Sequence, residues 1–138
     1  MIYLLDTCVL SELTRPKPER AVLRWLEALD DSAVVISVLT LGELERGVGK
    51  LPTGARKRAL AAWLEEIEGA YATRILDITA AVASEWGRLC ARSERQGVTM
   101  PVIDSLIGAT ALVHQLTVAT RNLADLNRTG ARTFNPWP

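Results

Sequence analysis

Four carboxylates stand where acidic side chains are able to do chemistry. Asp6 directly follows an apolar run that predicts a buried strand. Asp104 is the one charged residue of the apolar segment 101–113, where a charge costs several kcal/mol unless it is paired or binds a metal. Glu43 lies in a helical pattern, and Asp125 follows a later apolar run. These four acids are therefore the candidates for a functional site.

Each of these positions also has an ordinary structural explanation. Asp6 can cap a turn or helix that follows it, and Asp104 suits the first turn of a helix, where the macrodipole favours a negative charge. Glu43 can pair with a nearby cation such as Arg46 on a solvated helix face. Asn122, close to the fourth acid, can cap a short helix. Taken singly, none of the four acids requires a function.

Their expected positions in the fold change this interpretation. Asp6 and Asp125 follow strands whose carboxyl ends would meet at one edge of a parallel sheet, and the helices that carry Glu43 and Asp104 would leave that edge. Converging carboxylates repel one another and raise at least one pKa unless a cation is present. Oxygen ligands without His or Cys favour Mg²⁺ or Mn²⁺ over zinc. The pattern therefore predicts an ion that binds substrate phosphates and activates water.

Short apolar segments alternate with helical patterns along the whole chain. Strands are expected over residues 2–5, 33–36, 74–78, 116–120 and 132–134, and helices over 18–29, 37–50, 54–71, 79–95 and 101–114. The strand segments are apolar on both faces, which indicates a parallel sheet covered by helices. We therefore predict an α/β fold with a short parallel sheet of four to five strands flanked by helices.

Length and composition narrow the class of protein. The 138 residues suit a single domain over 1–138. Sixteen Lys and Arg residues balance sixteen Asp and Glu residues, which argues against nucleic-acid binding by overall positive charge but leaves room for local basic patches. No apolar run reaches the roughly 18 to 20 residues of a membrane span. A single histidine and two cysteines without metal-ligand spacing exclude a structural zinc site.

The start of the chain gives an expectation about location. It carries no basic residue, and Asp6 interrupts its apolar run, so a signal peptide is not expected. Cys8 and Cys90 are then expected to stay reduced in the cytoplasm.

Four segments in this order and spacing resemble the PIN-domain ribonucleases, in particular the VapC-type toxins of bacterial toxin–antitoxin pairs. The segments are YLLDTCVLSE (3–12), SVLTLGEL (37–44), PVIDSLIGATA (101–111) and TRNLADL (120–126). The resemblance implies a PIN-like three-layer fold and a Mg²⁺-dependent endoribonuclease that hydrolyses RNA phosphodiester bonds, with Mn²⁺ as a possible substitute. It also implies a homodimer, and a cognate antitoxin that blocks the acidic pocket and alone contacts operator DNA.

The same resemblance implies roles for individual residues. Asp6, Glu43 and Asp104 would form the catalytic metal site, with Asp125 as the fourth acid. Residues expected near the substrate are Thr7, Thr120 and Asn122. The chain departs from the family at two positions: Cys8 stands where Asn or Ser is common, and Asn122 stands where many members have an acid.

Basic residues near the start offer a path for RNA toward an acidic pocket. Arg15 and Arg20 belong to a cluster of four cations that follows the strand carrying Asp6. A solvated surface is the ordinary explanation of such a run. We nevertheless expect these two arginines to contact RNA, because their place in the chain is close to the candidate site.

Three other functions compete with this one. A phosphatase of the haloacid-dehalogenase type needs a second acid two residues after the first, where this chain has Cys8. A receiver domain needs a late lysine, and no lysine follows Lys57. The third alternative is a catalytically weak PIN module that acts mainly as a binding partner in an antitoxin–DNA complex.

Overall fold

A parallel sheet of five strands forms the centre of the computed structural model, which describes all residues from 1 to 138. The strands are β1 (Tyr3–Leu5), β2 (Val34–Ser37), β3 (Ile75–Leu76), β4 (Thr117–Ala119) and β5 (Arg132–Phe134), in the spatial order β3-β2-β1-β4-β5. Every neighbouring pair is parallel. Parallel neighbours need long crossover connections, and here helices supply them.

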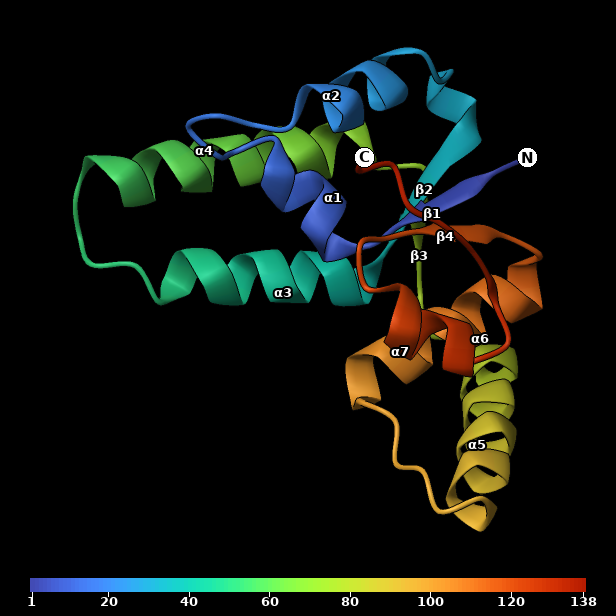
Figure 1. Cartoon of the computed structure of the whole chain (residues 1–138). Coiled ribbons are helices and arrows are strands. Elements are labelled where there is room, and N and C mark those ends of the chain that lie inside the picture. Colours follow the sequence, from blue (N-terminus) through green and yellow to red (C-terminus); the bar gives the residue numbers. More distant parts are fainter.

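Helices cover both faces of this sheet, which gives three layers. They are α1 (Thr7–Glu12), α2 (Arg20–Glu27), α3 (Val38–Gly49), α4 (Ala55–Ala70), α5 (Ala80–Arg95), α6 (Val102–His114) and α7 (Leu123–Arg128), with a single 3₁₀ turn, η1 (Asp31–Ala33), before β2. Figure 1 shows α1 to α4 on one side of the sheet and α5 to α7 on the other. No helix combines the length and the apolar character needed to cross a bilayer.

The central strand explains why both faces are apolar. Leu5 packs in the cluster that joins the sheet to α1, α2, α3 and α4, whereas Leu4 packs with Ile107 of α6 and Leu126 of α7. Leu4 and Leu5 are both completely buried. Successive side chains of a strand point to opposite faces, so one strand contributes to both cores. The carboxyl end of this strand is thereby held rigidly between two helical layers.

The predicted strands and long helices agree with the structure except at β3. Only two residues form that strand, against the expected 74–78, because it pairs with Ile36 and Ser37 of β2 alone. Two short helices, α1 and α7, follow the central strands β1 and β4. The sequence indicated them only as turns or short helices that an acid or Asn122 could cap.

Close packing of α6 on α7 sets the position of the fourth acid, and it leads to a first prediction. Gly108 of α6 is buried, and a methyl group there would overlap the side chain of Thr129 at the end of α7. We expect Gly108→Ala to lower the free energy of unfolding by about 2 kcal/mol. Gly87→Ala is the matched control, because that glycine lies in α5 with open space around it. It should stabilise the protein by up to about 1 kcal/mol. Urea denaturation measures both, and equal effects would contradict the packing described here.

Candidate active site

Asp6 is fixed at the carboxyl end of the central strand. Its backbone N–H donates to the carbonyl of Ala119, the last residue of β4 (3.0 Å). The residue is only 7% exposed, and both oxygens of its carboxylate accept hydrogen bonds. The Thr7 N–H donates to Oδ1 (2.9 Å), which caps α1, and the Thr120 hydroxyl donates to Oδ2 (2.8 Å). Asp6 therefore caps α1 and belongs to the candidate site at the same time.

Glu43 reaches the same place from the second turn of α3. The Ser37 hydroxyl caps this helix by accepting from the Leu39 N–H (3.0 Å), which fixes the start of the helix at the end of β2. The Thr7 hydroxyl donates to Oε1 of Glu43 (2.5 Å) and so joins α1 to α3. Glu43 forms no ion pair with Arg46. The half-buried carboxylate is held inside the site instead of lying on a solvated face.

Asn122 connects the other two acids. Asp104 lies in the first turn of α6, and Asp125 lies in the first turn of α7. The side-chain amide of Asn122 donates to Oδ2 of Asp104 (3.1 Å) and to Oδ2 of Asp125 (3.0 Å). Asn122 stands at the N-cap position of α7, but its side chain makes no capping bond there. Instead of capping the helix, the Asn122 side chain joins the two carboxylates.

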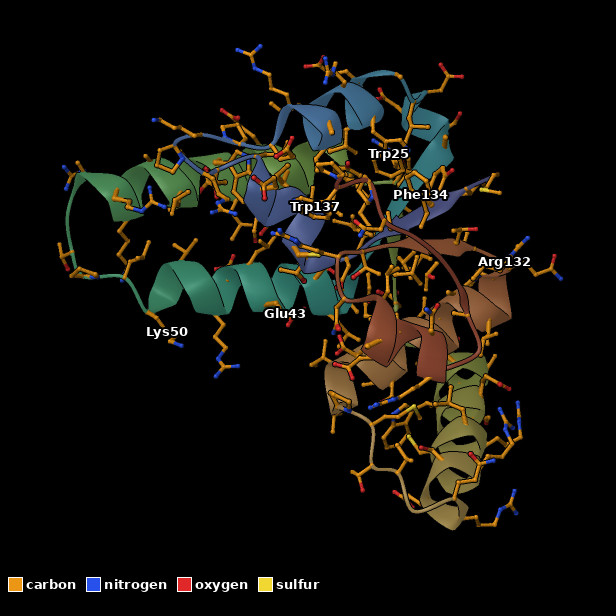
Figure 2. All side chains as sticks on the ribbon, viewed as in Figure 1. Trp25, Glu43, Lys50, Arg132, Phe134 and Trp137 are labelled. Carbon is orange, nitrogen blue, oxygen red and sulfur yellow. The ribbon has the colours of Figure 1, made fainter.

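These side chains meet at one pocket of about 480 Å³ beyond the carboxyl ends of β1 and β4. Figure 2 shows Glu43 on α3, closer to the sheet than Lys50 at the far end of this helix. Three of the four predicted acids are among the eight residues that line the pocket, whereas Asp125 is joined to it through Asn122. The lining residues are Asp6, Thr7, Cys8, Ser11, Glu43, Asp104, Arg121 and Asn122.

Burial, together with repulsion between the acids, changes the ionisation of Asp104. Burial, and then the negative charges of Asp6, Asp125 and Glu43, raise its pKa to about 6. The four acids are thus close enough to interact electrically even though they come from four separate segments of the chain. A site that disfavours its own negative charge is suited to a bound cation.

Cys8 does not act as an ionised nucleophile in this pocket. Its Sγ lies 3.9 Å from Oδ2 of Asp6 and 3.8 Å from Oγ1 of Thr120. Burial, and then the charge of Asp6, raise the pKa of the thiol. A cysteine nucleophile needs the opposite shift, so the structure argues against thiol chemistry.

The donor set fits a hard divalent ion in its chemistry. Every candidate ligand is a carboxylate oxygen, with hydroxyl oxygens of Thr7 and Thr120 beside them, and the only histidine, His114, lies on the exposed end of α6. Mg²⁺ and Mn²⁺ prefer such ligands. The side chains do not form a ready-made group of three ligands in this arrangement. The pocket thus contains oxygen ligands of the right type. These side chains would have to move closer together to coordinate one ion.

The remaining predicted residues occupy two different places. Thr7, Thr120 and Asn122 all contact the acids through hydrogen bonds, so they orient carboxylates. Arg15 lies in the turn after α1 and pairs with the buried Glu12 (3.4 Å), and Arg20 begins α2. These two exposed arginines do not line the pocket, and their contact with RNA stays a prediction.

Sequence reasoning did not single out two residues that line the pocket. Ser11 lies one helical turn after Thr7 on α1, and Arg121 directly follows Thr120. The i, i+4 spacing on a helix would have indicated Ser11. Arg121 could have been found because it directly follows Thr120, the first residue after β4.

Comparison with known proteins decides the family. A family model described as the PIN domain matches residues 3–131. The chain belongs to the PIN-domain family. This PIN domain is 38% identical to the toxin FitB of Neisseria gonorrhoeae over 137 residues, which cover 99% of both chains. It is 34% identical to the VapC ribonuclease Y4jK of Sinorhizobium fredii over 137 residues, which cover 99% of this chain and 98% of the relative.

Solved structures share this PIN fold over the whole chain. The crystal structure of FitAcB from Neisseria gonorrhoeae matches with a TM-score of 0.93 and 37% identity over 99% of both chains. The structure of VapBC2 from Rickettsia felis, bound to a DNA fragment from its promoter, matches with a TM-score of 0.82 and 26% identity over 100% of both chains. The predicted PIN-like α/β fold and the resemblance to VapC-type PIN domains are confirmed.

Proposed function

We propose that this PIN domain is the toxin of a toxin–antitoxin pair and a Mg²⁺-dependent endoribonuclease that hydrolyses phosphodiester bonds of RNA. The observation that carries the proposal is the pocket in which Asp6, Glu43 and Asp104 meet from three separate segments. Relatives named as a toxin and as a VapC ribonuclease, each matching nearly the whole chain, support the substrate class. Mn²⁺ is the expected substitute, because it accepts the same oxygen ligands.

The residues divide the work as their contacts suggest. Asp6, Glu43 and Asp104 would hold the ion, and Asp125 would act on it through Asn122. When bound, the ion supplies a Lewis acid that neutralises charge on the phosphate and lowers the pKa of water. The side chains of Thr7, Thr120 and Asn122 around it keep the carboxylates in place through hydrogen bonds. No general-base histidine is required, and the pocket contains none.

Partners follow from the same proposal. A solved relative from Mycobacterium tuberculosis is described as a member of the VapBC family of toxin–antitoxin systems, and the VapBC2 structure from Rickettsia felis is bound to a fragment of promoter DNA. We expect a cognate antitoxin to cover the acidic pocket and to be the component that contacts operator DNA. We also expect a homodimer and an action on RNA in the cytoplasm.

The Thr120 hydroxyl gives a second prediction. It is buried and donates to Asp6, so Thr120→Val should leave Oδ2 of Asp6 with only the Cys8 thiol as a donor (3.9 Å). We expect Mn²⁺ affinity to fall by about 10- to 100-fold, which is the usual cost of losing a partner of a metal ligand. Calorimetric titration of Mn²⁺ measures it, with Thr133→Val on β5 as the control, since that hydroxyl contacts Asn127 outside the site. Equal affinities in all three proteins would contradict the role of Thr120.

The direct test of the function uses purified chain from which any antitoxin has been removed. It should cut single-stranded or structured RNA in Mg²⁺ or Mn²⁺, and a chelator should stop the reaction. A chain that binds its antitoxin and operator DNA but cuts no RNA would instead support the alternative of a PIN module acting mainly as a binding partner.

A further inference from the structure

Arg121 is the one cation among the residues that line the acidic pocket. The exposed side chain follows the buried Thr120, which donates to Asp6, and precedes Asn122, which bridges Asp104 and Asp125. Both neighbours hold carboxylates of the site, so the backbone position of Arg121 is fixed relative to them. None of the ion pairs in the structure includes Arg121. The N–H donors of Arg121 are thus not paired with the carboxylates that lie beside it in the pocket.

The guanidinium lies over the ring of Trp137 instead, with its central carbon 5.4 Å from the ring centroid. This distance is within the range of a cation–π contact. Trp137 itself is 8% exposed and packs in the core cluster that contains Leu5 and Val9. Its backbone N–H donates to Oδ1 of Asn135 (3.0 Å), which turns the tail back onto the molecule. Figure 2 shows Trp137 beside α1, whose Val9 and Leu10 belong to the same core cluster. The indole is therefore a fixed surface for the arginine.

Stacking occupies the face of a guanidinium and leaves the N–H groups at its edge available. Those groups match the oxygens of a phosphate, to which arginine donates two parallel hydrogen bonds. Donors aimed at a phosphoryl group matter most when its charge grows in the transition state. The pocket is otherwise lined by acidic and neutral side chains, so no other side chain of the pocket offers a positive charge to the substrate.

We propose that Arg121 is a catalytic residue that binds the scissile phosphate through its N–H edge, and that Trp137 is a positioning residue that holds the guanidinium plane. This inference rests on the proposed function and adds to it the group that recognises the phosphate. It also gives the segment after β5 a role in the reaction, because that segment carries the ring that orients Arg121.

The test compares Arg121→Gln, Arg121→Lys, Trp137→Phe and Trp137→Leu with the wild type. Arg132→Gln is the matched control, because this exposed arginine lies on the edge strand β5, away from the pocket. Two readouts are needed. Anisotropy of a short labelled RNA in Ca²⁺ measures binding, and single-turnover cleavage of the same RNA in Mg²⁺ measures the reaction.

We expect Arg121→Gln to slow cleavage by about 10²-fold, since one lost donor to a developing oxyanion has an effect of that order. Binding should weaken by about tenfold, and Mn²⁺ affinity should not fall. Arg121→Lys keeps the charge but not the fork and should recover only part of the rate. Trp137→Phe keeps an aromatic face and should stay within about threefold of the wild type, whereas Trp137→Leu should lose about tenfold.

A double variant separates positioning from a merely structural role of Trp137. If the indole acts through the arginine, Trp137→Leu should have no further effect on cleavage in the Arg121→Gln background. Equal losses in both backgrounds would overturn the positioning role. Unchanged binding and cleavage in Arg121→Gln would overturn the role of Arg121 while the proposed function stands. A wild type that binds RNA through Arg121 without cutting it would overturn the proposed function alone, and one that neither binds nor cuts would overturn both.

Discussion

Asp104→Asn is expected to slow RNA cleavage by about 10³-fold, because it removes the charge of a proposed ligand of the divalent ion, and such an ion contributes several kcal/mol of transition-state stabilisation. The substitution preserves the local geometry. The carbonyl oxygen of the new side-chain amide can still accept the hydrogen bond that Asn122 donates to Asp104. Single-turnover cleavage measures the loss, and Asp77→Asn is the control, since this exposed acid forms no ion pair and lies outside the pocket.

The same substitution should stabilise the metal-free protein at neutral pH. The folded pKa of Asp104, about 6, exceeds its ordinary value of 3.8, so the folded state binds the proton more tightly than the unfolded state does. The wild type therefore loses stability as the pH rises from about 4 to about 6, and an amide at this position avoids that loss. We expect a gain of about 1 kcal/mol at pH 7, reduced by solvent screening of a half-exposed group. The gain should vanish below about pH 4, and urea denaturation at both pH values would show it. A variant less stable than the wild type at pH 7 would contradict this electrostatic account.

Asp6→Asn should slow cleavage about as much as Asp104→Asn does. It should, however, lower the free energy of unfolding instead of raising it. Both oxygens of Asp6 accept hydrogen bonds, from the Thr7 N–H and from the Thr120 hydroxyl. An amide has only one accepting atom, so one of these donors would face an NH₂ group. In a side chain that is almost completely buried, we expect a cost of about 1 to 3 kcal/mol.

The two isosteric substitutions serve as controls for each other. Each removes one negative charge from the same pocket, so a purely electrostatic origin of stability would make both variants more stable. Opposite changes in the free energy of unfolding at pH 7, with equal loss of cleavage, are the expected result. Retained cleavage in Asp6→Asn would show that the pocket is not the active site.

The fold could be predicted well because local patterns and global packing agree. The apolar run at the start of the chain lies between two helical layers, and both of its leucines are buried, as a two-sided hydrophobic pattern requires. The length of β3 could not be predicted, because Ile75 and Leu76 have the same apolar character as residues of central strands. Its length depends on how much of β2 pairs with it, and only Ile36 and Ser37 do so.

The acids of the candidate site could be predicted from the sequence, but the contacts around them could not. Asp104 could be recognised because it is the single charge in an apolar helix. The contact between Thr7 and Glu43 joins residues 36 positions apart, and no local pattern contains it. The cation–π contact of Arg121 with Trp137 also depends on where the tail returns to the core. Resemblance to the PIN family indicated the acids but assigned no role to these two residues.

The pocket lined by Asp6, Glu43 and Asp104 is expected to hold the divalent ion. Crystals of the antitoxin-free chain soaked in Mn²⁺ test it most directly, because anomalous scattering locates the metal independently of activity. We predict an anomalous peak bounded by Asp6, Glu43 and Asp104, with carboxylate oxygens at about 2.0 to 2.2 Å. A protein that cuts RNA in Mn²⁺ while its crystals show the ion elsewhere, or show none in this pocket, would contradict the account.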